Sequence, residues 1–444
     1  MLYDLILKNG TIVTSNKTLK ADIAVKDGKI VLVGELENTD TADEIYDAEG
    51  KHILPGIIDA HVHFRDPGLT EKEDFESGSR AAAFGGITFV ADMPNVSPVT
   101  STVELFKEKA QAAGEKSFID FGLFALLNNN NTDGIEGLIK AGALGFKVFL
   151  GTSTGNIAAP SAGILFEQMT KCARLGIRIG FHAESSELNS HFTSLCISTS
   201  GRSESLLLAD SRPVISEVLA IQTAICYAQY TGAEIHIHHV TSRDGAALAL
   251  EAKQKGVKVT AETCPHYLLL DTTMDAHKVY PPIRDKDHRM GLWEALGQGT
   301  IDMIASDHAP HCAHEKKLPL WEAPAGLCGV ETLVPLMLNE VNKGLLTLND
   351  FVRLASETPA KIWGIYPQKG SLKTGTDADF TIIDINKKSI ISLDNLHSKS
   401  GTSPYNGMEV QGLPQATIVR GRFVMKDGCL TGEKGFGSFI RAAL

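Results

Sequence analysis

The chain has 444 residues, 43% of them hydrophobic, and its 42 Lys and Arg against 53 Asp and Glu give a net charge of −11. This length and composition allow one large domain and a smaller one, with enough apolar material for a sizeable core. The acidic balance and the absence of a long basic run make nucleic acid an unexpected partner.

The N-terminal segment, MLYDLILKNGTIV, has no basic n-region, sustained apolar stretch or small-residue cleavage site. No apolar run in the sequence approaches the roughly 18 residues of a membrane-spanning helix. We therefore expect a soluble, cytoplasmic protein without membrane contact. The 7 cysteines include no CxxC pair, which predicts reduced thiols and no disulfide framework.

Short strand-like runs separated by turn signals characterise both ends of the chain. Asn9-Gly10 and Asp27-Gly28 separate such runs near the N-terminus, and Asp427-Gly428 follows two of them near the C-terminus. We predict that residues 1–54 and 368–444 form one composite β domain, a small β-sandwich, and that residues 55–367 form a separate domain.

Between these ends, apolar strand-like runs alternate with helical patterns, as in parallel sheets with crossover connections. Residues 101–113, for example, open with Ser and Thr capping candidates and carry Glu104. The alternation predicts an α/β fold, a (β/α)8 TIM-like barrel. An open doubly wound sheet is the weaker alternative, since no GxGxxG follows the first run. The eight runs are residues 57–63, 88–93, 118–123, 144–150, 177–182, 234–240, 258–262 and 301–306.

Histidines gather where these runs end. His61 and His63 lie two residues apart at the end of the first run, so that strand periodicity places both on one face. His182 closes the fifth run, and Asp307 follows the eighth. Because barrel active sites are built at the carboxyl ends of the strands, these side chains are candidates for a shared metal centre.

The sixth run holds three histidines, and spacing alone does not choose a ligand among them. Strand parity groups His239 with Ile235 and Ile237, which leaves His236 and His238 on the opposite face.

Lys147 lies inside the apolar run GFKVFLG, where an ammonium would be costly to bury unless it is modified or paired. Carboxylation by carbon dioxide would turn it into an anion able to bridge two cations. In isolation, a lysine whose ammonium reaches the barrel rim is the commoner situation. The position between the strands that carry histidines favours the bridge, and a nitrogen-rich donor set suits zinc.

Several motifs together, namely DAHVHFRDPG, DMPN, GFKVFLG, FHAE, HHVTS, YPPIR, ASDHAPH and PAGLCGVET, resemble the amidohydrolase superfamily, and within it the dihydroorotase branch. The resemblance extends from residue 1 to about residue 430. It implies a barrel with an appended β domain and two Zn²⁺ ions per subunit, bridged by carboxylated Lys147. The metal ligands that it implies are His61, His63, Lys147, His182, His239 and Asp307, with His238 as the second candidate beside His239.

The implied reaction is the reversible hydrolysis of the ring amide of L-dihydroorotate to N-carbamoyl-L-aspartate, in pyrimidine biosynthesis. A zinc-bound hydroxide would attack the carbonyl, and Asp307 would be the catalytic residue that carries the proton to the leaving nitrogen. The family also implies a homodimer.

Substrate recognition is assigned to residues beside the same strands. Arg65 lies two residues beyond His63, where a guanidinium could pair with the carboxylate of dihydroorotate. A neutral ring would leave that charge unpaired, which argues against allantoin, hydantoins and dihydropyrimidines. The resemblance adds Asn95, His311, Ala325 and Gly326 as substrate-binding residues. Tyr280 departs from the family, since many relatives have Asn before the Pro-Pro pair.

Two alternatives remain. An allantoinase or a dihydropyrimidinase/hydantoinase would keep the metal centre and change the pocket. A non-catalytic scaffold relative is the more remote alternative, because such a protein would be expected to lose ligands, and all of the candidates are present.

Overall fold

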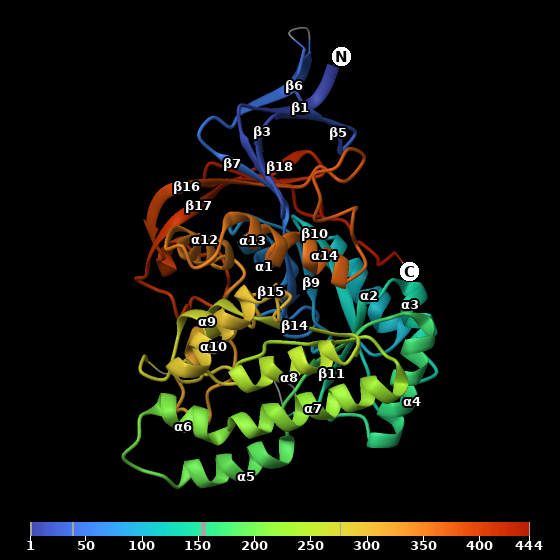
Figure 1. Ribbon diagram of the computed structural model, residues 1–444, viewed down its shortest axis with the longest axis vertical. Helices are drawn as coiled ribbons and strands as arrows, with labels where there is room; N and C mark the ends of the chain where they lie inside the picture. Colours follow the sequence, from blue (N-terminus) through green and yellow to red (C-terminus); the bar gives the residue numbers. More distant parts are fainter. Residues whose placement is uncertain (1, 38–39, 152–156, 276, 444) are drawn as a thin grey trace.

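The computed structural model describes residues 2–37, 40–151, 157–275 and 277–443. A parallel barrel occupies the middle of the chain, and a β-rich part contains strands from both chain ends. In Figure 1 the first strands (blue) and the last strands (red) lie together at one end of the molecule, far from α5 and α6. The predicted barrel with a β domain built from both termini is confirmed.

Eight parallel strands form the barrel, and they coincide with the eight predicted runs. Hydrogen bonds join them in chain order from β8 to β15, and an additional parallel bridge between Val62 and His308 links the first strand to the end of the last. All carboxyl ends therefore meet at one rim. The strands are β8 (Ile57–Val62), β9 (Ile87–Asp92), β10 (Asp120–Leu126), β11 (Gly145–Phe149), β12 (Ile179–His182), β13 (Ile235–Ile237), β14 (Val259–Thr263) and β15 (Met303–Ile304).

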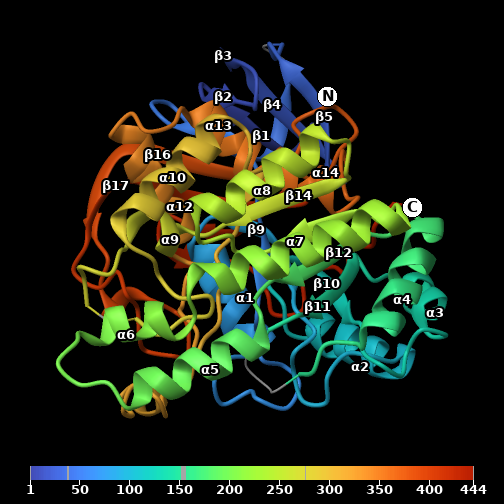
Figure 2. The same cartoon turned by 60° about the horizontal axis from the view of Figure 1, so that its bottom comes forward.

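Helices cover the outside of the barrel, as Figure 2 shows for α7 and α8. The predicted connector at 101–113 is α2, whose first turn is capped by the Thr102 side chain accepting a hydrogen bond from Leu105 N–H. The α-helices are α1 (Phe75–Phe84), α2 (Val103–Gly114), α3 (Ile135–Ala141), α4 (Ala162–Leu175), α5 (Ser186–Ile197), α6 (Glu204–Ser211), α7 (Val214–Thr231), α8 (Arg243–Gln254), α9 (Pro265–Leu269), α10 (Lys286–Gly297), α11 (Ala313–Lys316), α12 (Leu333–Asn342), α13 (Leu348–Val352) and α14 (Thr358–Ile362). The π-helix η1 (Arg353–Glu357) joins α13 to α14, and the 3-10 helix η2 (Leu393–Asn395) follows β16.

The β-rich part contains a four-stranded sheet, β5-β4-β1-β6, and a seven-stranded sheet, β19-β18-β17-β16-β7-β2-β3. In the second sheet β7 pairs with β16, which joins the two chain ends. The predicted turn at Asp27-Gly28 connects β4 to β5, and both residues have positive φ, as this tight hairpin turn requires. The strands are β1 (Leu2–Lys8), β2 (Thr11–Val13), β3 (Thr18–Lys20), β4 (Asp22–Lys26), β5 (Lys29–Gly34), β6 (Thr41–Asp47), β7 (His52–Pro55), β16 (Phe380–Ile390), β17 (Glu409–Val419), β18 (Arg422–Lys426) and β19 (Cys429–Leu430).

Two features of composition agree with the expectations. All seven cysteines are free thiols. Among the described residues, no helix combines the length and the apolarity needed to cross a bilayer. The domain boundaries at residues 54/55 and 367/368 stay a prediction.

A buried ion cluster joins the barrel to the β-rich part. The ammonium of Lys369 lies 2.9 Å from Asp377 Oδ2 and 2.8 Å from Asp379 Oδ2, and it also pairs with Asp120 on β10. Burial alone would lower the pKa of Lys369, but the three carboxylates outweigh it and raise that pKa. The lysine therefore remains charged, and it occupies the centre of an acidic cluster that could otherwise hold a cation.

We predict that Lys369→Met destabilises the protein by about 3–5 kcal/mol, because it leaves buried carboxylates without their counter-charge. Urea unfolding would measure the loss. Lys434→Met is the matched control: Lys434 pairs with Glu76 at 2.6 Å on the surface, where such pairs contribute about 0–1 kcal/mol. Equal unfolding midpoints for the two variants would contradict a structural role for the cluster.

Candidate metal centre and active site

A pocket opens at the carboxyl ends of the barrel strands. Its lining combines imidazoles, one lysine, one aspartate and a few groups suited to hold a small polar molecule. Every predicted metal ligand lies there, together with four of the five predicted substrate residues. The lining residues are His61, His63, Arg65, Asn95, Lys147, Phe149, His182, His239, Val279, Tyr280, Asp307, Ala309, Ala325 and Gly326.

His61, His63 and Asp307 bring one donor atom each to within 4.8 Å of one another. Asp307 Oδ1 lies 3.2 Å from His63 Nε2 and 3.4 Å from His61 Nε2. Burial raises the pKa of Asp307, but the contact with His63 and the positive charges that His266 and Lys147 can carry outweigh burial, so the pKa falls below its usual value. The arrangement offers two imidazole nitrogens and one carboxylate oxygen to a cation.

His182 and His239 form a second pair of donors. His182 Nδ1 lies 3.0 Å from His239 Nε2, and the other nitrogen of His182 lies 2.9 Å from the buried carboxylate of Glu184. Burial lowers the pKa of both imidazoles, which favours the neutral form that binds metals. Because Glu184 accepts the N–H of His182 Nε2, the Nδ1 lone pair faces His239, as in a site for a shared cation.

A positive φ explains why His239 reaches the pocket against strand parity. β13 ends at Ile237, and His239 has φ +40°. The left-handed backbone turns its side chain to the pocket, whereas parity alone groups it with outward-facing Ile235 and Ile237. Arg65 and Asp307 also have positive φ, at +62° and +47°. Such strained non-glycine residues are uncommon, and three of them line this one pocket.

Lys147 on β11 lines the same pocket as both groups of donors. Its side chain is 1% exposed, and its Nζ finds no hydrogen-bond partner within the part of the chain that the structure describes. Burial lowers the pKa of this amine to about 7, so a neutral, nucleophilic form is accessible near neutral pH. An orphaned buried amine beside four imidazoles fits a site that is completed by carboxylation and metal binding.

The guanidinium of Arg65 is held in place by contacts with Pro310 and His311. Arg65 Nε donates to Pro310 O at 3.2 Å, and Nη2 lies 3.3 Å from His311 Nε2. His311 does not line the pocket; it supports Arg65 and lies 3.0 Å from Ala325 O. Arg65 Nη1 makes no hydrogen bond to any described residue. This nitrogen is the donor that Arg65 can offer to a molecule in the pocket.

The amide of Asn95 is partly used within the site. Its Oδ1 lies 2.7 Å from His63 Nδ1, so it accepts the N–H that fixes the orientation of His63. The Oδ1 atom of Asn95 is thus engaged, and the amide nitrogen is the group that Asn95 can offer to the pocket.

The segment containing Ala325 and Gly326 is tied down by hydrogen bonds. Lys316 Nζ donates to Pro324 O at 3.1 Å and to Gly326 O at 2.8 Å, and Gly326 N–H donates to Lys278 O. A Cβ at Gly326, whose φ is +147°, would lie 2.3 Å from Ala309 O, so only glycine fits. Both backbone polar groups of Gly326 thus have partners within the protein. This residue therefore forms the wall of the pocket.

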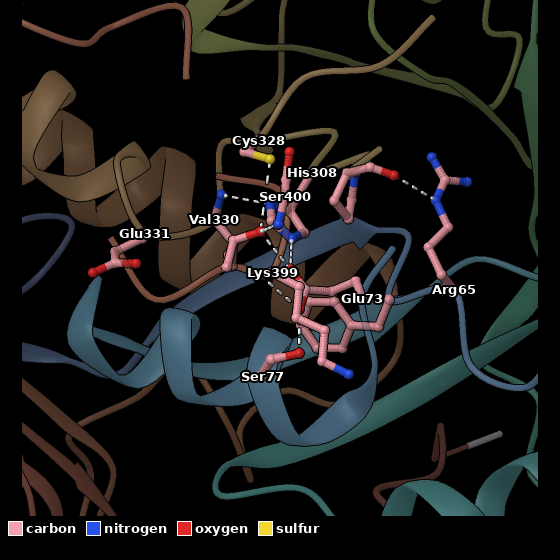
Figure 3. Close-up of polar contacts among 12 residues, drawn as sticks. Arg65, Glu73, Ser77, His308, Cys328, Val330, Glu331, Lys399 and Ser400 are labelled. Atoms are coloured by element: carbon pink, nitrogen blue, oxygen red, sulfur yellow. Dashed lines mark hydrogen bonds and ion pairs between the residues drawn. The ribbon is translucent and has the colours of Figure 1, made fainter. Parts of the chain in front are cut away.

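A second layer of hydrogen bonds supports the segment that follows Asp307 (Figure 3). His308 Nδ1 accepts from Gly329 N–H and Val330 N–H, so its proton lies on Nε2, which is 3.4 Å from Glu73. The hydroxyls of Ser77 and Ser398 donate hydrogen bonds to the Glu73 carboxylate. Three segments far apart in the sequence thereby fix the backbone next to Asp307.

The sequence motifs did not indicate two further buried groups. Glu262 on β14 contacts three histidines, and Arg212 pairs with Glu184 while its Cζ lies 3.7 Å from the centre of the Tyr280 ring. Tyr280 thus lines the pocket, and its ring packs against the guanidinium of Arg212. Nothing in the spacing of Glu262 or Arg212 pointed to the site, because both act through residues distant in sequence.

Comparisons with known proteins agree with this geometry. Residues 52–424 match the Amidohydrolase family, and residues 1–51 match the N-terminal domain of the urease alpha-subunit. The chain is 38% identical to L-hydantoinase of Paenarthrobacter aurescens, over 99% of this chain and 98% of that protein. It is 38% identical to allantoinase of Deinococcus radiodurans, over 97% of each. The structure of L-hydantoinase from Arthrobacter aurescens superposes with a TM-score of 0.96 at 37% identity, covering 99% of this chain and 100% of that one.

The chain therefore belongs to the amidohydrolase family, and it is an enzyme of the cyclic amide hydrolase class. The narrower prediction of a dihydroorotase is wrong. A dihydroorotase, from Methanosarcina acetivorans, is 34% identical, whereas L-hydantoinase and allantoinase are each 38% identical over nearly their full lengths. The argument from Arg65 failed because Pro310 and His311 already contact two of its three nitrogens, and a single neutral acceptor could engage the remaining Nη1.

We predict that His239→Asn removes at least one bound cation and that His238→Asn removes none. His239 faces His182 in the pocket, whereas His238 lies beneath it, with Nδ1 2.9 Å from Glu262. Metal analysis of the purified variants would measure the difference. Loss of metal in the His238 variant alone would reverse the assignment.

Proposed function

We propose that the enzyme hydrolyses the ring amide of a hydantoin-type ureide, with allantoin and 5-substituted hydantoins as the substrates to test. The single observation that carries this proposal is the 38% identity to both L-hydantoinase and allantoinase over nearly the whole chain. The substrates in those two names share a five-membered ring in which one nitrogen lies between two carbonyl groups. Water would add to a ring carbonyl carbon, the carbon–nitrogen bond would break, and a carboxylate and a ureido group would result.

The donor set fits two divalent cations, for which we propose zinc. His61, His63 and Asp307 would hold one ion, and His182 and His239 the other. When bound, such ions polarise a carbonyl group and lower the pKa of water. Lys147 would complete the centre: its neutral amine forms a nitrogen–carbon bond to carbon dioxide and releases a proton, and the resulting carbamate anion would bind both ions.

Asp307 is placed to move the proton. Its carboxylate is buried, and its pKa is held below the usual value, so it is an anion ready to accept a proton from the attacking water. The same oxygen could then release that proton to the ring nitrogen as the carbon–nitrogen bond breaks. The His63 N–H···Asn95 and His182 N–H···Glu184 bonds keep the surrounding imidazoles oriented during this transfer.

The protein would recognise the ring through the neutral carbonyl groups of the substrate. A ring carbonyl could accept a hydrogen bond from Arg65 Nη1, since a carbonyl oxygen has the lone pairs that one N–H donor needs. The Asn95 amide nitrogen offers a second donor, while Tyr280 and the Ala325–Gly326 segment would limit the space around the ring. The expected partner is thus a small molecule; a homodimer and a cytoplasmic location stay predictions.

The test is a substrate panel assayed with a pH indicator, because ring opening produces an acid. We expect the zinc-loaded enzyme to open allantoin or a 5-substituted hydantoin, and to open the six-membered dihydrouracil more slowly. Chelation should abolish the activity and zinc should restore it. Zinc-loaded protein that opens none of these rings would refute the proposed function.

We predict that Asp307→Asn lowers kcat by about 10²–10⁴-fold, the range that a positioned general acid–base group contributes. Steady-state kinetics, with the bound metal measured in parallel, would show whether the loss is in proton transfer or in metal binding. Asp302→Asn is the control: its carboxylate pairs with Lys253 at 2.7 Å outside the pocket. A kcat for Asp307→Asn equal to that of the control would remove Asp307 from the mechanism.

A further inference from the structure

Three imidazoles converge on one buried carboxylate beneath the candidate metal centre. Glu262 Oε1 contacts His61 Nδ1 and lies 2.9 Å from His238 Nδ1, while Oε2 lies 3.0 Å from His236 Nε2. All four side chains are 0–1% exposed. Glu262 belongs to β14, a barrel strand that supplies none of the predicted metal ligands.

The contact with His61 decides which nitrogen of that ring can bind a cation. A neutral imidazole carries its proton on one nitrogen only, and an oxygen acceptor at Nδ1 draws the proton there. The lone pair is then on Nε2, which lies 3.4 Å from Asp307 Oδ1 and forms no hydrogen bond with the described residues. With the proton on Nε2 instead, His61 could not ligate from this face.

His238 keeps the carboxylate in place. Its ring stacks on Trp363 at a centroid distance of 6.1 Å and an angle of 10°, and it meets the His61 ring edge-on at 4.5 Å. On the neighbouring strand β12 is Gly180, where an added Cβ would lie 2.1 Å from His238 Nε2. The imidazole is therefore wedged between neighbours, and Glu262 Oε1 is held against His61.

We infer that Glu262 is a positioning residue of the metal centre, whose Oε1 fixes His61 in the Nδ1–H form and so presents Nε2 to a cation. The inference rests on the proposed metal centre, but it does not depend on which ring the enzyme opens. Its essential feature is the acceptor oxygen at the Oε1 position. The charge of the carboxylate is not required, since the two N–H groups that contact Oε1 need only a hydrogen-bond acceptor.

The test compares zinc affinities, measured by competition of the metal-free protein with a chromophoric chelator. Glu262→Leu removes the acceptor, and we expect the affinity for zinc to fall about 10–100-fold, as when outer-shell partners of metal ligands are lost. Glu262→Gln keeps an amide oxygen that can occupy the Oε1 position, and its amide nitrogen can donate to His236. We expect this variant to bind zinc within a few-fold of the wild type.

Glu331→Leu is the matched control. Its carboxylate also holds an imidazole, with Oε1 2.7 Å from His397 Nδ1, but that pair lies outside the pocket. The control should bind zinc like the wild type. The inference is overturned if Glu262→Leu binds zinc like the control, or if Glu262→Gln is as weak as Glu262→Leu.

A measurement on the unmutated protein covers the case in which Glu262→Leu does not fold. In metal-free protein labelled with ¹⁵N-histidine, the chemical shifts of His61, assigned with His61→Asn, report which ring nitrogen carries the proton. A proton on Nδ1 supports the inference, and a proton on Nε2 refutes it. Wild-type protein that binds no zinc would instead defeat the proposed metal centre, and the two failures are thus distinguishable.

Discussion

The site depends on one constraint that applies to three of its four imidazole ligands, His61, His63 and His182: a ring that turns a lone pair inward needs a fixed acceptor for the N–H of its other nitrogen. Glu262 serves His61, Asn95 serves His63, and Glu184 serves His182. Without these acceptors, buried N–H groups would lose hydrogen bonds at a cost of about 1–3 kcal/mol each. The surroundings of the ligands therefore determine the chemistry of the pocket as much as the ligands themselves.

The fold supports this arrangement because the barrel is nearly closed and is anchored to the β-rich part. Parallel strands joined in order from β8 to β15 bring all ligand-bearing ends to one rim, and the Val62–His308 bridge links the first strand to the last. At the joint with the β-rich part, Lys369 ties β10 to Asp377 and Asp379 through buried ion pairs. A rigid frame of this kind can hold strained residues such as His239 and Asp307 in the left-handed region.

Substrate choice in this class depends on a few side chains around a shared centre, which explains why Arg65 misled the sequence argument. A guanidinium beside a metal site indicates a carboxylate on the substrate only if the guanidinium has no hydrogen-bond partners within the protein. Here Pro310 and His311 contact two of its nitrogens, and Nη1 makes no hydrogen bond to a described residue. Tyr280 contacts Arg212, which pairs with Glu184, and Glu184 in turn orients His182, so the pocket wall is connected to a candidate metal ligand.

Much of this protein was predictable from sequence, because strand periodicity and turn residues are local signals. The eight strands, the β-rich part built from both chain ends and the rim position of His61, His63, His182 and Asp307 all follow from them, since parallel strands end at the same edge. Parity failed at His239, where a positive φ reverses the direction of the side chain. The partners of Arg65 and the contacts of Glu262 also required the tertiary structure. Glu262 and His61 are 201 positions apart, and only folding brings such a carboxylate to the ring that it orients.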